Sequence, residues 1–223
     1  METRSVYESW LNEPTLDEAT RAELRAISAD APEIEERFYR ELEFGTAGLR
    51  GILGAGTNRM NVYVVRRATQ GLSNYLLTCP DAKERGVCIA YDSRLFSPEF
   101  AKETACVLAA NGIRTYLFST LHSVPQLSFA VRHLGCMAGV VITASHNPSK
   151  YNGYKVYWAY GGQAAPEQAA AIYDEIKKVS MFSPKLADYD TAVAAGKITL
   201  VGAQEDEAYY TATEALLLEP DLV

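Results

Sequence analysis

The sequence has no long uninterrupted hydrophobic run. A helix that crosses a bilayer needs about 18 or more consecutive apolar residues, and no stretch of this 223-residue chain approaches that length. The opening residues, Met1 to Arg4, do not begin a signal peptide, because no apolar segment follows them. We therefore expect a soluble, cytoplasmic protein that has no membrane partner.

An excess of positive charge is absent as well. The formal net charge is −7 and the sequence pI is about 5.1. Proteins that bind nucleic acid or anionic lipid usually present a strongly basic surface, so we expect neither as the main partner. A site for a phosphorylated ligand must then be a local cluster of cations.

Neither the histidines nor the cysteines have the spacing of a metal site. His122 and His133 have no carboxylate or histidine neighbour at ligand spacing, and we interpret both as structural. The cysteines lie far apart in apolar contexts, which predicts buried reduced thiols; they are Cys79, Cys88, Cys106 and Cys136.

The sequence does contain a regular alternation of apolar strands and capped helices. Strands are predicted at 87–91, 113–118 and 140–142, and the helices between them are predicted to begin at Ser97 and just after Ser123. This order implies a largely parallel sheet with helices on both faces and ligands at the carboxyl ends of the strands. We predict the α/β class: a three-layer α/β/α sandwich with a mixed, mostly parallel sheet, plus an N-terminal helical extension.

Polar residues follow the buried strand at 140–142. Ser145, His146, Asn147 and Lys150 share one loop there. A serine at the end of a rigid strand can be both exposed and fixed in place, as a nucleophile must be. A lone Ser-His pair is more often a turn cap beside an ordinary loop histidine, and on these residues alone that alternative stays open.

The segment after this loop argues against an esterase. A hydrolase nucleophile elbow requires Gly-x-Ser-x-Gly between a strand and a helix. Here Thr143 and Asn147 flank the serine, and the turn signal Asn152-Gly153 and the β-rich stretch 154–158 follow it. Acyl transfer is therefore disfavoured.

Two further segments carry candidate ligand contacts. Residues 44–56 are dense in glycine, which suggests turns or an anion-binding loop, and Arg50 within them offers a bidentate phosphate donor. Asp92, Ser93 and Arg94 follow the strand at 87–91. Arg94 either pairs with Asp92 for structure alone or acts near the serine.

The stretch Thr143 to Pro148, which reads Thr-Ala-Ser-His-Asn-Pro, resembles the active-site signature of the α-D-phosphohexomutases. Asn152, Gly153 and Lys155 match the Asn-Gly-x-Lys segment that follows it, and residues 45–51 are similar to the first phosphate-contacting loop of that family. The helical leader and residues 57–61 most resemble the phosphoglucomutase branch, which also includes phosphopentomutases. The resemblance covers residues 40 to 223, approximately, and only the N-terminal portion of the family's length.

The resemblance implies a phosphoserine mechanism. Ser145 would carry the phosphoryl group between the 1- and 6-positions of a hexose phosphate, with a hexose 1,6-bisphosphate as intermediate and activator. Lys155 would serve as a cation and candidate acid/base, and His146 would orient the loop or contact the sugar. Mg²⁺ would bind a phosphate oxygen on Ser145, with its remaining ligands outside this chain. The residues expected to contact substrate or phosphate are Arg50, Asn147 and Arg94.

The family's later loops and its terminal phosphate-binding domain do not occur in these residues. We therefore predict an N-terminal helical extension at 1–42, the phosphoserine-bearing domain 1 at 43–204, and the beginning of a truncated second domain at 205–223. The missing C-terminal domains of the same enzyme would be partners, and the chain alone should fold without turning over hexose phosphates. Residues 216–218 should be poorly buried.

Three questions remain open at this stage. A non-catalytic phosphosugar-binding module would keep the fold but lack turnover, and the sugar could be glucose, mannose or a pentose. Lys155 could instead be a charged residue that protects an edge strand from aggregation. The sequence does not indicate an oligomeric state.

Overall fold

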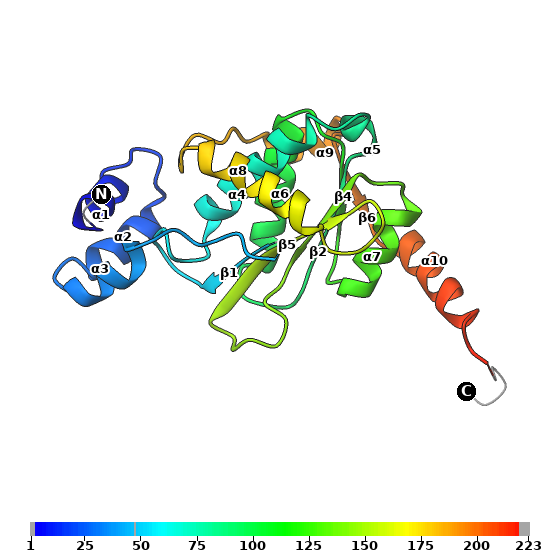
Figure 1. Cartoon of the computed structure of the whole chain (residues 1–223), viewed down its shortest axis with the longest axis horizontal. Helices are drawn as coiled ribbons and strands as arrows, with labels where there is room; N and C mark the ends of the chain where they lie inside the picture. Colours follow the sequence, from blue (N-terminus) through cyan, green and yellow to red (C-terminus); the bar gives the residue numbers. More distant parts are fainter. Residues whose placement is uncertain (1–2, 47, 219–223) are drawn as a thin grey trace.

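The computed structural model describes residues 3–46 and 48–218, which Figure 1 shows as a sheet flanked by helices. Within these residues, six strands form one sheet in the order β1-β5-β4-β2-β3-β6. Strand β5 is antiparallel to β4 and β1, and the other pairs are parallel, so the predicted fold class is confirmed. The strands are β1 (Gly48–Ile52), β2 (Val87–Tyr91), β3 (Thr115–Phe118), β4 (Ala138–Ile142), β5 (Tyr151–Trp158) and β6 (Ile198–Val201).

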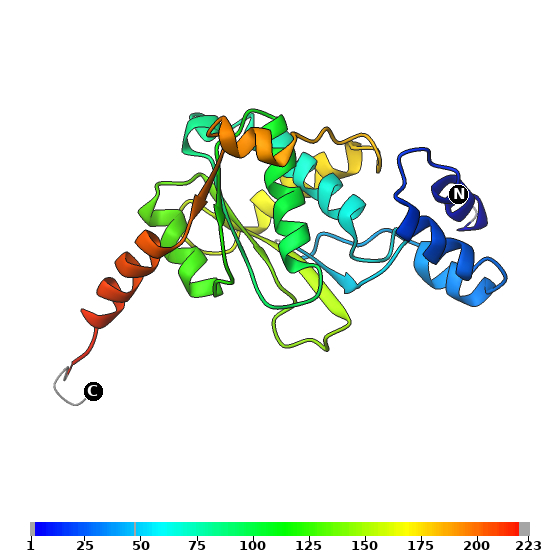
Figure 2. The same ribbon diagram turned by 180° about the vertical axis from the view of Figure 1, so that it is seen from behind.

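Helices cover both faces of the sheet, and Figure 2 shows α10 projecting from the end opposite the N-terminal helices. Among the residues that the structure describes, the helices are α1 (Thr3–Leu11), α2 (Glu18–Ala26), α3 (Ala31–Phe38), α4 (Val62–Leu76), α5 (Ala82–Arg85), α6 (Ser97–Ala110), α7 (Val124–His133), α8 (Pro166–Lys178), α9 (Tyr189–Ala194) and α10 (Ala203–Glu214).

Alternate residues of the central strands enter two separate cores. In β2, Val87 and Ile89 pack into the core that α4, α6 and α8 cover, whereas Cys88 and Ala90 pack into the core that α7 covers. Strand β4 is buried over its whole length for the same reason. Burial on both faces fixes the end of β4, where the loop that carries Ser145 begins.

The N-terminal helices α1 to α3 have a small core of their own. Trp10 lies edge-on to Phe38 and Tyr63, with ring centroids 5.7 Å apart in each pair, and 5.1 Å from Phe182. Because Tyr63 belongs to α4, this cluster fastens the helical extension to the α/β body. The N-cap of α2 is Asp17.

Asp17 gives a test of this attachment. Its carboxylate accepts hydrogen bonds from Thr20 N at 2.9 Å and from the Tyr63 hydroxyl at 2.9 Å. We expect Asp17→Ala to lower the free energy of unfolding by about 1–2 kcal/mol, as measured by urea denaturation. Asp17→Asn keeps an acceptor oxygen and should lose less. Equal losses for the two variants would contradict the capping role.

The Asp17 carboxyl also predicts a pH dependence. Burial raises its pKa, but hydrogen bonds from Thr20 and Tyr63 outweigh burial and leave the pKa below its ordinary value. The stabilisation is therefore present above the unfolded-state pKa of about 4 and is lost as the pH falls through the lower folded-state pKa. The stability difference between wild type and Asp17→Ala should shrink in that acid range.

Two local predictions were wrong for one reason. The glycine-dense segment contains the edge strand β1 rather than turns alone, and Asn152-Gly153 lies inside β5 rather than in a turn. A Cβ at Gly48 would lie 2.4 Å from Tyr154 O, so glycine allows close strand contact here rather than chain reversal. Strand β5 lies between β1 and β4, so the edge-strand interpretation of Lys155 is also wrong.

The remaining expectations concern solvent and membrane exposure. Across residues 3–46 and 48–218, no helix has both the length and the apolarity needed to cross a membrane. Leu216, Leu217 and Leu218 expose 77%, 47% and 97% of their surface, as predicted, and residues 219–223 lie outside the described residues.

The cysteines are thiols, as predicted. Cys88, Cys106 and Cys136 are buried and Cys79 is partly buried. Burial raises the pKa of Cys106 to about 11 and that of Cys136 to about 12, so both stay protonated at neutral pH.

Candidate active site

Ser145 lies just beyond β4, in the loop 143–150 that connects β4 to β5. Its side chain is exposed, and its backbone has φ 56°, in the left-handed region that a non-glycine residue enters only at a cost of about 1 kcal/mol or more. The Thr143 hydroxyl accepts a hydrogen bond from Ser145 N at 3.0 Å, and Asn147 N donates to Ala144 O at 3.1 Å. The loop is therefore a tight turn that presents the seryl oxygen to solvent.

Arg94 holds this turn from the neighbouring β2–α6 connection. Its guanidinium donates to carbonyl oxygens along the loop at 2.7 to 3.1 Å, namely those of Ser145, Asn147, Pro148 and Tyr151. Backbone carbonyls that converge on one planar cation fix the loop more rigidly than exposed turn residues could alone. Arg94 therefore lies both near the serine and beside Asp92, the two alternatives that the sequence leaves open.

Asp92 orients Arg94, and Asn152 holds the residues that follow Arg94. Asp92 Oδ2 lies 3.3 Å from Arg94 Nε, and Asp92 Oδ1 accepts from Arg94 N at 3.0 Å and from the Ser97 hydroxyl at 2.9 Å. The buried amide of Asn152 donates to Leu95 O at 2.9 Å and to Ser97 Oγ at 3.0 Å. Asn152 thus joins β5 to the β2–α6 connection. The turn predicted at Asn152 gave no indication of this role.

The position of these loops follows from the order of the strands. The chain passes from β2 to β3 on one side and then returns to β4 on the other side of β2. In open α/β sheets, ligands bind where the strand order reverses in this way, beyond the carboxyl ends of the strands. The Arg94 and Ser145 loops are the two that follow β2 and β4. They border a recess of about 470 Å³ lined by Asp92, Ser93, Arg94, Leu95, Ser145, Asn147 and Ser149.

Arg50 reaches the serine loop from β1. Its guanidinium Nη1 donates to Asn147 Oδ1 at 3.0 Å. Because Arg50 pairs with Gly153 and Gly48 pairs with Lys155, Arg50 and Lys155 are diagonal neighbours on one face of the β1–β5 ladder. Glycine stands opposite each of the two cations. Arg50 and Lys155 therefore have no bulky side chain directly opposite them on the paired strand.

His146 and Lys155 are less directly connected to Ser145. The closest contact of the imidazole is Nδ1 to Ser145 Oγ at 3.4 Å, at the long end of hydrogen-bond range. Lys155 lies on β5 and is partly exposed. The structure therefore brings together Ser145, His146, Asn147, Arg50 and Arg94 through direct contacts, and relates Lys155 to them through Arg50.

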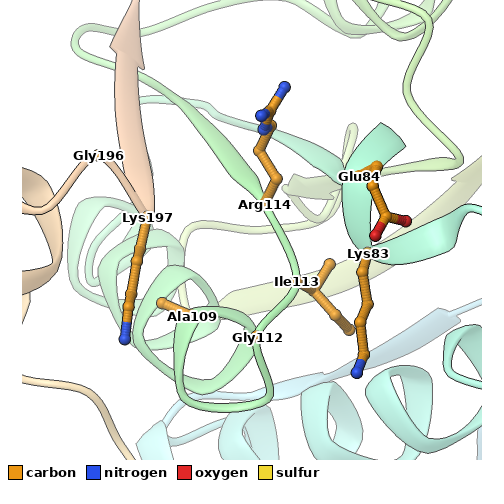
Figure 3. Close-up of a pocket in the computed structure, with 8 residues that line it drawn as sticks. All are labelled: Lys83, Glu84, Ala109, Gly112, Ile113, Arg114, Gly196 and Lys197. Atoms are coloured by element: carbon orange, nitrogen blue, oxygen red, sulfur yellow. The ribbon is translucent and has the colours of Figure 1, made fainter.

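A second recess lies at the other end of the sheet, where β3 and β6 begin (Figure 3). It has a volume of about 320 Å³. Figure 3 shows Arg114 extending away from Lys83 and Lys197, so these cations do not converge on one anion. At the Ser145 recess, by contrast, the cation Arg94 and Ser145 line the same hollow.

The fit to a divalent cation is incomplete. In the part of the chain that the structure describes, no cluster of three or more His, Cys, Asp or Glu side chains could hold a metal ion. Asp92 is the carboxylate that lines the serine recess, and it already binds Arg94 and Ser97. Mg²⁺ prefers carboxylate and phosphate oxygens in octahedral geometry, so these residues do not by themselves form its site.

His122 is buried and structural, as predicted, and it has a carboxylate partner far away in the sequence. Its Nε2 lies 2.9 Å from Asp206 Oδ1, a carboxylate 84 residues away on α10, and its ring stacks on Phe118 with centroids 3.9 Å apart. No local spacing could show this partner. The contact joins α10 to the loop after β3.

The sheet, its helical layers and the serine loop at the carboxyl end of β4 define an α/β/α protein with its candidate site at a strand end. Residues 41–182 match the family described as phosphoglucomutase/phosphomannomutase, alpha/beta/alpha domain I. The chain belongs to the phosphoglucomutase/phosphomannomutase family.

Individual relatives agree with this assignment. A phosphoglucomutase of Staphylococcus saprophyticus is 40% identical over 181 residues, a match that covers 81% of this chain and 32% of that protein. A mouse phosphopentomutase is 39% identical over 176 residues, covering 76% of this chain and 28% of that protein. The chain therefore spans about a third or less of the length of these relatives.

Solved structures show the same architecture. The crystal structure of a Thermus thermophilus protein, which bears the name phosphomannomutase as a provisional assignment, superposes with a TM-score of 0.62 at 30% identity. That match covers 80% of this chain and 36% of the other. The open form of the phosphoprotein parafusin from Paramecium superposes with a TM-score of 0.60 at 19% identity, which supports the fold alone.

Proposed function

We propose that this chain is the serine-bearing domain of a phosphohexomutase, an isomerase that moves a phosphoryl group between the 1- and 6-positions of a hexose phosphate. The observation that carries the proposal is the arrangement at the end of β4. There Ser145 is exposed in a strained turn, its backbone carbonyl accepts a hydrogen bond from Arg94, and Arg50 borders the loop through Asn147. Phosphoryl transfer depends on in-line positioning and on cations around the transferring oxygens, and the two arginines beside the Ser145 loop support the second requirement.

In the proposed reaction Ser145 carries the phosphoryl group. A sugar hydroxyl attacks the phosphorus of phosphorylated Ser145, the bond from phosphorus to the seryl oxygen breaks, and a bond from phosphorus to the sugar oxygen forms. The sugar hydroxyl loses its proton as this bond forms and the departing seryl oxygen gains one, with Lys155 as the candidate acid/base for this transfer. In the second transfer the seryl oxygen attacks the phosphorus at the other position of the bisphosphate, and the bond from that phosphorus to the sugar oxygen breaks. Ser145 is phosphorylated again, and the sugar keeps its phosphoryl group at the new position.

The neighbouring side chains take separate roles in this proposal. Arg50 is the phosphate clamp, because its contact with Asn147 places a bidentate donor at the edge of the loop. Arg94 holds the loop, and any direct contact between Arg94 and phosphate stays a prediction. Lys155 is the cation and candidate acid/base, and His146 orients the loop or contacts the sugar. Asn147 is a further substrate contact.

The complete activity requires groups that the described residues do not supply. We propose that Mg²⁺ binds a phosphate oxygen on Ser145 together with ligands from further domains, and that a hexose 1,6-bisphosphate is the activator. The proposed domain limits remain 1–42, 43–204 and 205–223. By the complete protein we mean this chain together with those further domains. The relatives act, by name, on glucose, mannose or pentose phosphates, so the sugar itself stays open.

Phosphate mapping tests the proposal. The complete protein is incubated with glucose 1,6-bisphosphate and Mg²⁺, and phosphate is located by mass spectrometry. We expect modification at Ser145 and loss of that signal in Ser145→Ala. Phosphate only at other residues would contradict the proposal, and sugar phosphate binding without phosphoryl exchange would favour the non-catalytic module instead.

Lys155 has a testable role of its own. Because Lys155 is a cation on the open face beside Arg50, we expect Lys155→Met to lower kcat/KM by more than about tenfold, or about 1.4 kcal/mol of transition-state stabilisation. Steady-state kinetics of the complete protein measure this effect. Lys150→Met is a matched control, because Lys150 is an exposed lysine in the neighbouring loop. Unchanged kinetics for Lys155→Met would remove Lys155 from the mechanism.

A further inference from the structure

Strand β1 lies beside the serine loop, but within the sheet it is supported by one neighbouring strand. In the described sheet β1 is an edge strand, so β5 is its neighbour on one side only. An edge strand is more easily displaced than a central one, because half of its backbone groups have no strand partner. Arg50, the proposed phosphate clamp, lies in the middle of β1. Its position therefore depends on contacts from outside the sheet.

Those contacts come from the N-terminal helices. The turn that follows β1, residues 53–60, is hydrogen-bonded along one side to the end of α3 and the chain just after it. The bonds are Asn58 N to Arg37 O at 2.9 Å, Thr57 Oγ1 to Arg40 O at 2.7 Å, Asn58 Nδ2 to Glu36 O at 2.9 Å and Leu42 N to Thr57 O at 3.0 Å.

The Arg37 side chain is at the centre of this contact. It is only 13% exposed, and its guanidinium pairs with Glu23 of α2, donates to Glu33 Oε1 at 2.7 Å and donates to Ala55 O at 3.2 Å. Glu23 Oε1 in turn accepts from Ala55 N at 3.2 Å. Both backbone groups of Ala55 are thus held by one ion pair, which ties α2, α3 and the turn together.

The glycines of the turn show how closely it approaches this ion pair. Gly54 has φ 140°, and a Cβ there would lie 2.9 Å from Glu23 Oε1. Gly56 has φ 132°, and a Cβ there would lie 2.8 Å from Arg37 O. Larger residues would push the turn away from the helices, so its glycine content follows from this contact rather than from a ligand.

The turn is rigidly continuous with β1 and with the serine loop. Met60 N donates to Ile52 O at 2.8 Å, and Leu53 N donates to Lys150 O at 2.8 Å. On the face of β1 opposite Arg50, Leu42 packs so closely that a Cβ at Gly51 would lie 2.9 Å from it. A displacement of the turn would therefore displace both β1 and the anchor point of the serine loop.

We propose that Arg37 is a positioning residue for Arg50: its ion pair with Glu23 clamps the turn 53–60 and thereby fixes β1 against the serine loop. The helical extension is then part of the support of the phosphate site, although none of its side chains from residue 3 onward lines the serine recess. The claim that β1 is fixed in this way stands on geometry alone, whereas its consequence for phosphoryl transfer rests on the proposed function.

Amide hydrogen exchange tests the clamp in this chain. In Arg37→Met we expect the amides of Leu53, Ala55 and Asn58 to exchange about tenfold faster or more, while the amides of β4 keep their rates. Glu23→Gln is a milder variant that keeps an oxygen for Ala55 N and should give a smaller change at the same amides. Arg25→Met is the matched control, because Arg25 pairs with Glu18 on the exposed surface of α2. Unchanged rates in the turn, or equal acceleration throughout the chain, would overturn the proposal.

A double-mutant cycle tests the link to Arg50. In the complete protein we expect Arg37→Met and Arg50→Gln each to lower turnover, and the double variant to be no slower than Arg50→Gln alone, because Arg37 acts through Arg50. Multiplicative effects would show a merely structural role and overturn the link. If the exchange result holds while Ser145→Ala and Arg50→Gln keep normal turnover, the proposed function fails and the clamp on β1 stands.

Discussion

Ser145→Ala in the complete protein should reduce turnover to background, a loss of more than about ten-thousandfold. The reason is that the phosphoryl group has no other carrier in the proposed mechanism, so both half-reactions stop together. Binding of glucose 6-phosphate should persist, because the cations that would bind it, Arg50 and Lys155, are unchanged. A coupled assay with the bisphosphate activator and Mg²⁺ measures turnover, and calorimetry measures binding.

Ser149→Ala is the control for this experiment. Ser149 lies in the same loop, lines the same recess and is exposed to solvent, as Ser145 is. It lacks the position at the end of β4 and the left-handed backbone of Ser145. We expect near-normal turnover. Comparable losses in the two variants would show that the loop needs hydroxyl groups in general and that Ser145 has no special role.

Arg94→Met should produce the second large effect. The substitution leaves the loop carbonyls without their donor and Asp92 without its cation, so the turn that holds Ser145 loses its shape. We expect turnover to fall by about a hundredfold or more and the free energy of unfolding to fall by about 2–4 kcal/mol. Arg94→Lys should restore little, because a single ammonium cannot reproduce the planar fork that reaches separate carbonyls.

Arg85→Met separates the site effect from simple loss of an arginine. Arg85 also donates to loop carbonyls, those of Gly135 at 2.9 Å and Cys136 at 3.0 Å, but in the connection before β4 rather than after it. We expect reduced stability with turnover preserved. Hydrogen exchange at Asn147 and Tyr151 should accelerate in Arg94→Met alone. Normal turnover in a folded Arg94→Met protein would refute the loop-holding role.

The parts of the fold that could be predicted depend on residues close in sequence. Asn61 caps α4 through Val64 N, and Ser123 forms a capping box with Gln126; both signals lie within three residues of the helix they begin. The continuous apolar run that ends at Ile142 correctly indicated a strand buried on both faces. Helix caps and apolar runs of this kind can be recognised from the sequence alone.

The parts that could not be predicted depend on distant partners. Strand β1 exists because Gly48 and Gly153 allow two backbones to approach, yet glycine in isolation indicates a turn. Asn152 in an Asn-Gly pair likewise suggested a turn, whereas its amide is buried against the β2–α6 connection. The contact between Arg94 and the serine loop joins residues more than 50 positions apart, so the sequence alone left its role open between two alternatives.

The left-handed backbone at Ser145 limits which amino acids could perform the proposed chemistry. Threonine offers the same hydroxyl group, and from the standpoint of phosphorus chemistry it would be an equivalent acceptor. Its branched Cβ, however, makes φ 56° much less favourable than it is for serine. A threonine would pull the backbone toward extended conformations and turn its oxygen out of the recess. For the proposed nucleophile, main-chain geometry therefore favours serine over threonine as much as reactivity does.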